Sequence, residues 1–298
     1  MQDYILLDTG PSERGAHRIM TAGKCLRQYA YDVQAHAGPT KKEPKNPAFM
    51  VGTMLHLMLA HRYAIKAFRD GADTLDAADR VLTHDDADRI LSPLLALSEF
   101  VERDTSGQAD QFVDGVMAAY AAYDVKYGAE SKWEVIGVER QYRVNLPGVP
   151  TEISLYTQRA DLVVRDRSTG LVYFVDHKKA YEISAKTAAQ YTLHGQFLGY
   201  AKLGRHFYGD KFGGVTLNRI KVTPPQFSRT PIDPAPRAVA SYVANVVAIE
   251  KMIQHCITTH GPAELTPEAW PAAFSEEVCY GKYGKCKYFE RCRFGAAP

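Results

Sequence analysis

The stretch RADLVVRDRSTGLVYFVDHKKA, residues 159–180, decides the fold of this 298-residue chain. Alternating and β-branched residues on either side of a short Gly-containing turn predict two antiparallel strands. If the turn is a four-residue loop, Asp166 pairs with Leu171, and counting back along both strands places Asp161 directly opposite Asp176. Side chains alternate between the two faces of a strand, so Asp176 and Lys178 share a face.

This predicted hairpin places two like charges side by side. The Cβ atoms of directly opposite residues lie roughly 5 Å apart, and at an effective dielectric constant of about 20 two carboxylates at that distance repel by ~3 kcal/mol. A divalent cation between them reverses the sign of that interaction, and carboxylate oxygens suit Mg²⁺ or Mn²⁺. The alternative is a surface hairpin with scattered charges, and a β-bulge in either strand would remove the register argument.

Two carboxylates and a lysine in this arrangement suit the hydrolysis of a phosphodiester bond. A metal ion held by Asp161 and Asp176 binds a phosphate oxygen and lowers the pKa of a bound water molecule. Lys178 lies on the same face, where it orients the nucleophile and stabilises the negative charge that develops. Asp161, Asp176 and Lys178 are therefore the predicted catalytic residues.

The rest of the chain alternates between helical and extended patterns. We expect strands over 134–146, 153–166, 171–178 and 214–223, and helices over 50–69, 75–127 (two or three), 184–206 and about 237–259. A proline-rich connection is expected over 224–236. The predicted fold class is α/β, with a small mixed β-sheet flanked by helices.

The ordered motifs of this chain resemble those of the PD-(D/E)XK nuclease superfamily, in the RecB-like branch that includes CRISPR-adaptation and phage recombination exonucleases. That pattern is a helix with His, a strand with Asp, a strand with (D/E)-x-K and a helix with Q-x-x-x-Y. The matching segments are VGTMLHLMLA, RADLVV, FVDHKKA and GQFLGYAKL. The chain departs from the pattern where Ala160 replaces the Pro, and its second acid is Asp, which the pattern permits, rather than the more frequent Glu.

The resemblance implies a restriction-endonuclease-like core and assigns roles to further residues. His56 would join Asp161 and Asp176 as a metal ligand, although a lone His on an apolar helix is more often a core residue. The carbonyl group of His177 would be another ligand. Gln196 and Tyr200, four residues apart on one helix face, would contact DNA or order the lysine.

The cysteines form a second pattern, C-x6-C-x5-C near the C-terminus with one distant cysteine near the N-terminus. It resembles the iron–sulfur staple of AddB-type nucleases and CRISPR-adaptation exonucleases, in which one N-terminal and three C-terminal cysteines hold a [4Fe–4S] cluster. The alternatives are a structural zinc site, although tight C-x2–4-C pairs are absent, and unligated thiols. The implied ligands are Cys25, Cys279, Cys286 and Cys292. Cys256 is expected to be a buried helical residue.

A single domain over 1–298 is expected, with three parts. Helical material, including an insertion, covers about 15–130, the nuclease core about 134–223, and a helix with the cysteine-rich tail about 237–298. The net charge is only +2, so a basic surface for nucleic acid must be local. The tail interleaves cations and aromatic rings, which suits phosphate contacts and base stacking but is also common on a solvated surface; these residues are Tyr280, Lys282, Tyr283, Lys285, Lys287, Tyr288, Phe289, Arg291 and Arg293.

From these patterns we predict a metal-dependent DNA nuclease, an exonuclease acting on single-stranded or duplex ends in recombination, repair, or phage or CRISPR-type processing. The alternatives are an endonuclease of the same fold, a non-catalytic DNA-binding scaffold, and a zinc-containing RNA-processing protein. No ATP-binding P-loop is present, so a helicase partner would be a separate chain; a recombinase, a single-strand-binding protein and self-association are the other expected partners.

The location expected from the sequence is the cytoplasm of a bacterium or of a phage-infected host. No apolar run reaches the ~18 residues of a membrane span, and the N-terminal residues lack the pattern of a secretory signal. A complete disulfide framework is not expected, because pairing five cysteines would leave one thiol over.

Overall fold

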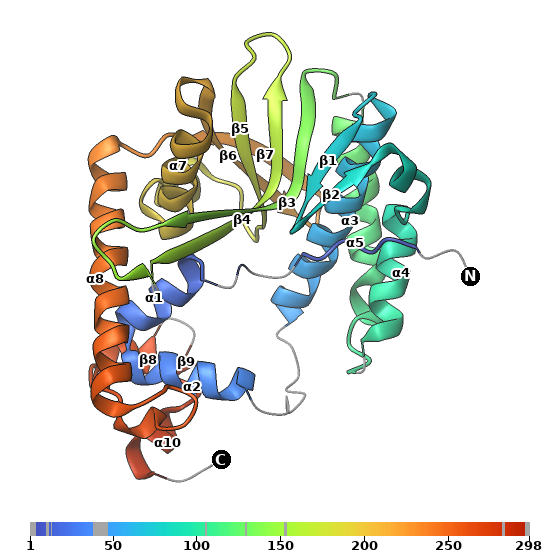
Figure 1. Ribbon diagram of the computed structural model, residues 1–298. Coiled ribbons are helices and arrows are strands. Elements are labelled where there is room, and N and C mark those ends of the chain that lie inside the picture. The colour runs from blue at the N-terminus through green and yellow to red at the C-terminus, as the bar shows by residue number, and fades with distance from the viewer. Residues whose placement is uncertain are drawn as a thin grey trace. The chain divides into compact units, whose positions relative to one another are not determined.

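A computed structural model of the protein describes residues 4–9, 12, 14–37, 47–104, 106–128, 130–151, 154–281 and 284–295. It confirms the predicted α/β class: a seven-stranded mixed sheet is flanked by helices (Figure 1). The chain divides into two compact units. The first comprises Met1–Ser12, Glu43–Tyr142 and Gln158–Val239, and the second comprises Glu13–Lys42, Arg143–Thr157 and Ala240–Pro298.

The strand order of the sheet is β2-β1-β3-β4-β5-β6-β7. The β1/β2, β4/β5 and β6/β7 pairs are antiparallel, whereas β1/β3 and β5/β6 are parallel. The bounds are β1 Thr74–Ala77, β2 Arg80–Thr83, β3 Trp133–Asn145, β4 Leu155–Asp166, β5 Val172–Lys179, β6 Phe212–Lys221 and β7 Gln226–Ile232.

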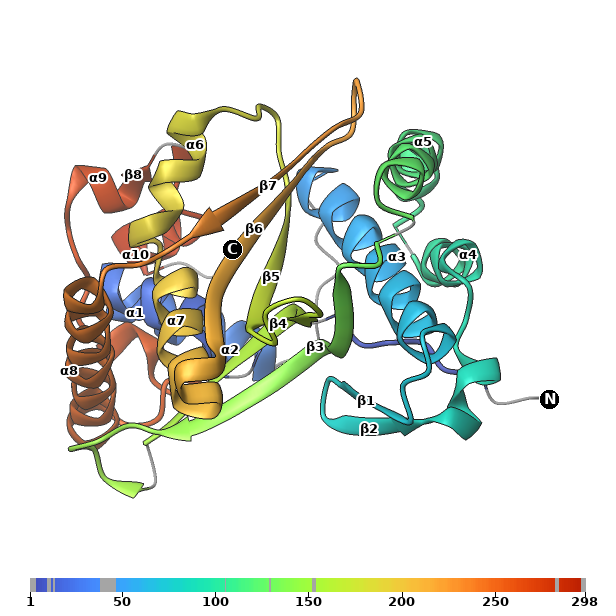
Figure 2. The ribbon, with the colours of Figure 1, turned by 90° about the horizontal axis from the view of Figure 1, so that it is seen from above.

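Helices of the first unit cover both faces of its sheet (Figure 2). On one face lie α3 (Pro47–Arg69), α4 (Pro93–Arg103) and α5 (Asp110–Tyr127), and on the other lies α7 (Gly195–Tyr208). Apolar residues recur along α3 because it packs against the sheet: Met54 and Met58 are fully buried in one core with Leu162 and Val175. The remaining short helices of this unit are η1 His84–Arg89, α6 Ala185–Ala189, η3 Gln190–Leu193 and η4 Gly209–Lys211.

Three sequence-based expectations differ from the structure. The proline-rich segment 224–236 contains strand β7, which tolerates Pro231 because it lies at the edge of the sheet. The segment 75–127 contains the β1–β2 hairpin before its two α-helices. The helix expected over 184–206 is interrupted before α7. His194 is the N-cap residue of α7, and its Nδ1 atom accepts a hydrogen bond from the Gln196 N–H group (3.4 Å).

The second unit contains α1 (Ala16–Lys24), α2 (Leu26–Ala37), most of α8 (Pro236–His260) and the C-terminal tail. The carboxylate of Glu250, on α8, is buried and forms ion pairs with Arg14 and Arg18. The tail contributes η5 Pro267–Ala269, α9 Glu276–Cys279, β8 Tyr280–Gly281, β9 Gly284–Lys285 and α10 Phe289–Phe294. Among the described residues, no helix combines the length and apolarity needed to cross a membrane.

Candidate active site

The β4–β5 hairpin has the register that the sequence predicts. Its ladder runs from Arg165 opposite Val172 to Leu162 opposite Val175, and the Asp166 N–H group donates to the Leu171 carbonyl (2.9 Å). The next residues beyond this ladder are Asp161 and Asp176, whose side chains are 8% and 0% exposed. The two acids therefore lie at the same level of the sheet and are both removed from solvent.

Local interactions in the turn hold this register. The Oδ1 atom of Asp166 accepts hydrogen bonds from the N–H groups of Ser168 (2.9 Å) and Thr169 (3.1 Å) and from the Ser168 hydroxyl group (2.5 Å). These bonds, the Ser168 hydroxyl first, keep the pKa of Asp166 below its ordinary value. Gly170 closes the turn with φ at +71°, a conformation that glycine adopts without a steric penalty.

Asp176 and Lys178 lie on the same face of β5, as the alternation predicts. The Nζ atom of Lys178 lies 2.7 Å from Oδ2 of Asp176. Burial alone would lower the pKa of Lys178, but the carboxylates of Asp176 and Asp161 outweigh it and raise that pKa. The lysine is therefore a fixed positive charge at neutral pH.

Helix α7 brings Gln196 and Tyr200 to the same aspartate. The Nε2 group of Gln196 donates to Oδ1 of Asp176 (2.8 Å) and to the Tyr200 hydroxyl group (2.9 Å). That hydroxyl group lies 2.7 Å from the Arg159 carbonyl and 3.2 Å from Oδ1 of Asp176, so it donates to one of the two. Burial raises the pKa of Tyr200 well above its ordinary value, so the phenol stays protonated. Both helix residues orient Asp176, the acid that pairs with Lys178.

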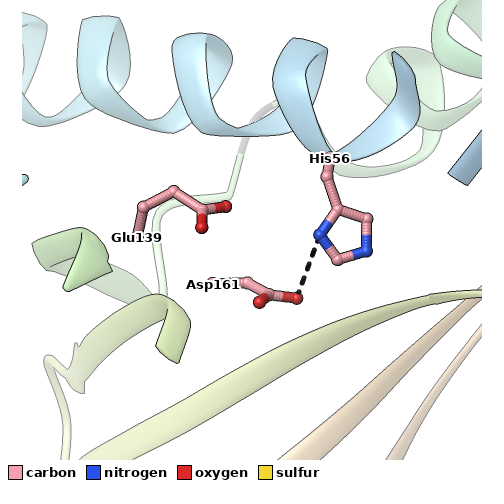
Figure 3. A group of neighbouring side chains, drawn as sticks. All are labelled: His56, Glu139 and Asp161. Atoms are coloured by element: carbon pink, nitrogen blue, oxygen red, sulfur yellow. Dashed lines mark ion pairs between the residues drawn. The ribbon is translucent and has the colours of Figure 1, made fainter. Parts of the chain in front are cut away.

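His56, Glu139 and Asp161 form a group of three possible metal ligands (Figure 3). One ligand atom from each lies within 4.8 Å of the other two, and Nδ1 of His56 lies 3.4 Å from Oδ2 of Asp161. His56 comes from α3, Glu139 from β3 and Asp161 from β4. The motif comparison finds the first and the third of these but not Glu139.

Glu139 has three features of a functional residue. It is 3% exposed, its Oε1 atom has no hydrogen-bond partner among the described residues, and its φ is +51°. A left-handed conformation costs a residue other than glycine about 1–2 kcal/mol. The one signal in the sequence is an acid inside the apolar strand segment VIGVE, at a position where most strands carry an apolar side chain.

The electrostatics of this group fit a bound cation. Burial raises the pKa of Glu139 well above its ordinary value, and the Asp161 carboxylate raises it further. Burial also raises the pKa of Asp161, which His56 opposes and Asp176 reinforces. Buried carboxylates this close repel one another unless a proton or a cation lies between them, and two carboxylates with an imidazole are a suitable donor set for Mg²⁺ or Mn²⁺.

His177 contributes through its backbone. Its N–H group donates to Oδ2 of Asp161 (2.7 Å). The N–H and C=O groups of one strand residue point to the same side, so the His177 carbonyl also points toward β4 and Asp161. Its side chain lies on the opposite face of β5 from Asp176, where Nδ1 accepts a hydrogen bond from the Asn218 amide (2.8 Å). Burial, followed by the positive charges nearby, lowers the pKa of His177 well below its ordinary value.

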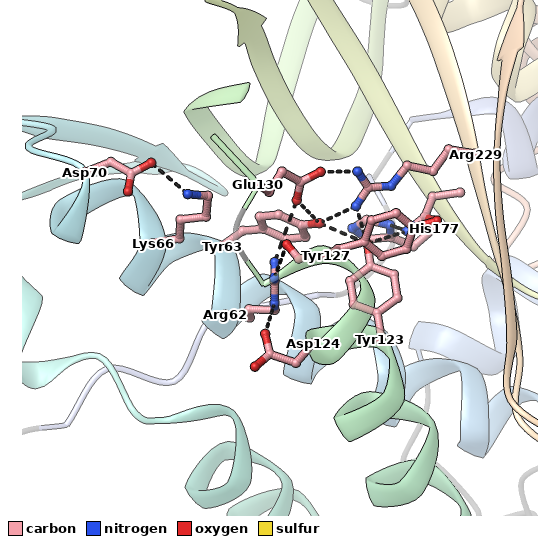
Figure 4. A network of polar contacts seen from close by, with 11 residues as sticks. Arg62, Tyr63, Lys66, Asp70, Tyr123, Asp124, Tyr127, Glu130, His177 and Arg229 are labelled. Carbon is pink, nitrogen blue, oxygen red and sulfur yellow. Dashed lines mark hydrogen bonds and ion pairs between the residues drawn. The ribbon is translucent and has the colours of Figure 1, made fainter. Parts of the chain in front are cut away.

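A buried polar network supports His177 from that side (Figure 4). The His177 ring stacks on Tyr63, with ring centroids 5.9 Å apart. Arg229 forms an ion pair with Glu130 and donates to the hydroxyl groups of Tyr63 (2.9 Å) and Tyr123 (2.8 Å). The network fixes the imidazole and with it the backbone that faces Asp161.

Four of the five cysteines surround one cavity of about 390 Å³ in the second unit: Cys25, Cys279, Cys286 and Cys292. Arg27 donates to Sγ of Cys292 (3.6 Å), and the Gln28 N–H group donates to Sγ of Cys25 (3.4 Å). Cys256 is buried in α8 and does not line this cavity. Of the basic and aromatic tail residues, Lys282 and Tyr283 lie outside the described residues.

Comparisons with known proteins agree with the motif order. The family model for the PD-(D/E)XK nuclease superfamily matches residues 16–293. No curated protein matches the chain. Among the solved structures that match is the crystal structure of SSO0001, which is 13% identical in sequence. The match covers 72% of this chain and 87% of the SSO0001 chain, with a TM-score of 0.29.

Proposed function

The chain belongs to the PD-(D/E)XK nuclease superfamily, and from that premise we propose that it is a metal-dependent deoxyribonuclease that degrades DNA from its ends. Nucleases of this superfamily hydrolyse phosphodiester bonds with divalent metals such as Mg²⁺ or Mn²⁺. One observation carries the proposal: the ligand group of His56, Glu139 and Asp161 lies beside Asp176, which is already paired with Lys178.

The metal ligands in this proposal are His56, Glu139, Asp161, Asp176 and the carbonyl group of His177. A divalent metal bound by these residues would polarise a phosphate and lower the pKa of a water molecule. Lys178 carries a fixed positive charge toward the negative charge that develops on the phosphate oxygens. Gln196 and Tyr200 hold Oδ1 of Asp176, which leaves Oδ2 for the metal ion beside Lys178.

The preference for ends rests on the Q-x-x-x-Y helix of the RecB-like exonucleases. In this chain both residues of that motif, Gln196 and Tyr200, lie within hydrogen-bond distance of Asp176, so they help to position this acid. The biological setting that follows is recombination, repair, or phage or CRISPR-type DNA processing. A recombinase, a single-strand-binding protein, a separate helicase, self-association and a cytoplasmic location remain predictions, as does the single-domain organisation.

The test is degradation of end-labelled linear DNA and of circular DNA, single- and double-stranded, with Mg²⁺ or Mn²⁺. Wild type is compared with Asp176→Asn and with the surface control Asp210→Asn. The proposal requires that wild type and the control shorten linear DNA, spare circles and stop in chelator, while Asp176→Asn is inactive. Cleaved circles would make the protein an endonuclease, and binding without cleavage on any substrate would make it a scaffold.

We also propose that the four cysteines around the cavity hold a [4Fe–4S] cluster. Their donor set consists of thiols alone, which suits iron–sulfur chemistry. A tetrahedral zinc site with bonds of about 2.3 Å needs sulfur atoms roughly 3.8 Å apart. Such zinc sites usually use tight C-x2–4-C pairs, and the sequence has none. This spacing along the chain supports a cluster over a single zinc ion.

Metal content distinguishes these two cofactors. Protein purified without oxygen is analysed for iron, sulfide and zinc, and Cys279→Ser is compared with Cys256→Ala, a cysteine outside the cavity. The proposal predicts about four iron and four sulfide per chain, retained in Cys256→Ala and lost in Cys279→Ser. One zinc per chain with no sulfide would replace the cluster with a structural zinc site.

A further inference from the structure

A second cavity, of about 330 Å³, opens where strands β5 and β6 end. Its apolar wall includes Val51 of α3, Phe112 and Gly115 of α5, and Val222. Its polar rim includes Lys179, Tyr181 and Lys221. Among the described residues, the charged side chains that line this cavity are those of Lys179 and Lys221, so its charge is positive.

This cavity lies beside the proposed active site along two separate elements. On β5, the side chain of Lys179 alternates to the face that carries His177, and the His177 ring lies 6.0 Å from the ring of the proposed metal ligand His56. On α3, Val51 precedes His56 by five residues, which is about 7.5 Å along a helix axis. The start of α3 and the end of β5 lie close together in the ribbon (Figure 2). The cavity is therefore within reach of a nucleotide next to the one whose phosphate enters the site.

Tyr181 offers an aromatic surface at the rim. Its side chain is 75% exposed, and the Nζ atom of Lys179 lies 3.4 Å from the centroid of its ring. An exposed ring beside cations is the arrangement with which proteins bind unpaired bases and their phosphates. The Lys179 ammonium group covers one face of the Tyr181 ring, which leaves the other face for a base. Within the described residues, neither Lys179 nor Lys221 forms an ion pair with a carboxylate, so both can contact phosphate oxygens.

We propose that this cavity is a subsite for one unpaired base of the DNA strand being cut. The base stacks on Tyr181 against the apolar wall, and Lys179 and Lys221 contact the flanking phosphates. A base in a duplex is stacked and paired, so only a single-stranded or unwound end can place a base there. The inference rests on the proposed nuclease function and deepens it, because it makes the substrate strand single-stranded at the site.

Binding of single-stranded oligonucleotides in chelator tests the subsite without catalysis. Each position in turn is replaced by an abasic nucleotide, and affinity is measured by fluorescence anisotropy. For wild type, one position near the bound end is expected to lower affinity about fivefold to a hundredfold, the range of base stacking on an aromatic ring. Tyr181→Ala is expected to bind intact DNA more weakly by the same factor and to lose that positional penalty.

Three further variants make the result specific. Tyr181→Phe keeps the ring and is expected to keep the penalty, as is Tyr4→Ala, an exposed tyrosine that does not line the cavity. Lys221→Gln is expected to reduce the slope of log affinity against log salt by about 0.7, the value for one phosphate contact with a single strand. An abasic penalty that persists in Tyr181→Ala, or that wild type lacks at every position, would overturn the subsite.

Failure of this inference is separable from failure of the proposed function. If the wild type hydrolyses DNA in the presence of metal but binds every abasic oligonucleotide as well as intact DNA, the protein is a nuclease without this subsite. A penalty that depends on Tyr181, in a protein that hydrolyses no DNA, leaves a single-strand-binding surface without the nuclease.

Discussion

The Nζ atom of Lys178 lies 2.7 Å from Oδ2 of Asp176, two residues earlier on the same face of β5. The other oxygen of that carboxylate accepts a hydrogen bond from Gln196. One oxygen of Asp176 is thus anchored by a hydrogen bond to α7, and the other faces the Lys178 ammonium group. This arrangement orders the lysine through an acid that is itself anchored to α7.

Loss of the Lys178 charge should affect chemistry more than folding. We expect Lys178→Met to lower kcat at least about a hundredfold, the usual cost of removing one group that stabilises transition-state charge. Single-turnover hydrolysis of a labelled oligonucleotide measures it, with Lys186→Met, an exposed lysine, as the matched control. A kcat within a few-fold of wild type would remove Lys178 from the catalytic set.

Glu139 is expected to bind metal, and its buried carboxylate is expected to lower the free energy of unfolding of the metal-free protein. Its carboxylate is buried beside Asp161, and burial raises its pKa. Glu139→Gln removes the repulsion, so the free energy of unfolding in chelator should stay the same or rise, while the increase in Tm that Mn²⁺ causes should shrink. Thermal unfolding with and without Mn²⁺ checks both. An unchanged Mn²⁺ response would exclude Glu139 as a ligand.

The Tyr200 hydroxyl group should matter through Asp176. Tyr200→Phe leaves the ring packed but removes the hydroxyl that lies within hydrogen-bond distance of the Arg159 carbonyl and of Asp176. We expect a loss of about 1–3 kcal/mol in the free energy of unfolding, the cost of a buried polar group without a partner, with a fall in kcat and little change in KM. Tyr242→Phe, which removes a hydroxyl bonded to Tyr156 in the second unit, is the control for stability alone. Equal effects of both variants on kcat would contradict the positioning role.

His61 should make the protein sensitive to acid. Its buried ring accepts a hydrogen bond from the Leu7 N–H group (3.1 Å) and donates one to the Leu91 carbonyl (2.8 Å). Burial lowers its pKa from 6.5 to about 4, so the unfolded chain binds the proton more tightly. The contribution of His61 to the free energy of unfolding is complete above about pH 6.5. As the pH falls toward 4, the free energy of unfolding decreases by roughly 3 kcal/mol.

Urea unfolding between pH 7 and pH 4.5 in chelator measures this loss. His61→Gln retains an acceptor and a donor but does not titrate, so it should flatten the pH dependence that His61 causes. An identical pH dependence in the variant would assign the acid sensitivity to other groups.

The sequence by itself determined the β4–β5 hairpin and the shared face of Asp176 and Lys178. The reason is local: the turn length and the two-residue period of a strand set the register. The ordered motifs also indicated the family, because His56, Gln196 and Tyr200 occur in sequence around the hairpin.

Tertiary structure alone decided the parts that depend on neighbours distant in the chain. Strand β7 forms despite Pro231 because it has an edge position, which no local propensity encodes. Glu139 joins His56 and Asp161 only because β3 lies next to β4 and has a left-handed residue at that point. The cavity at Tyr181 likewise needs α3, α5 and two strand ends to meet. Residue spacing specifies the contacts within one hairpin, whereas contacts between elements follow from how the whole core packs.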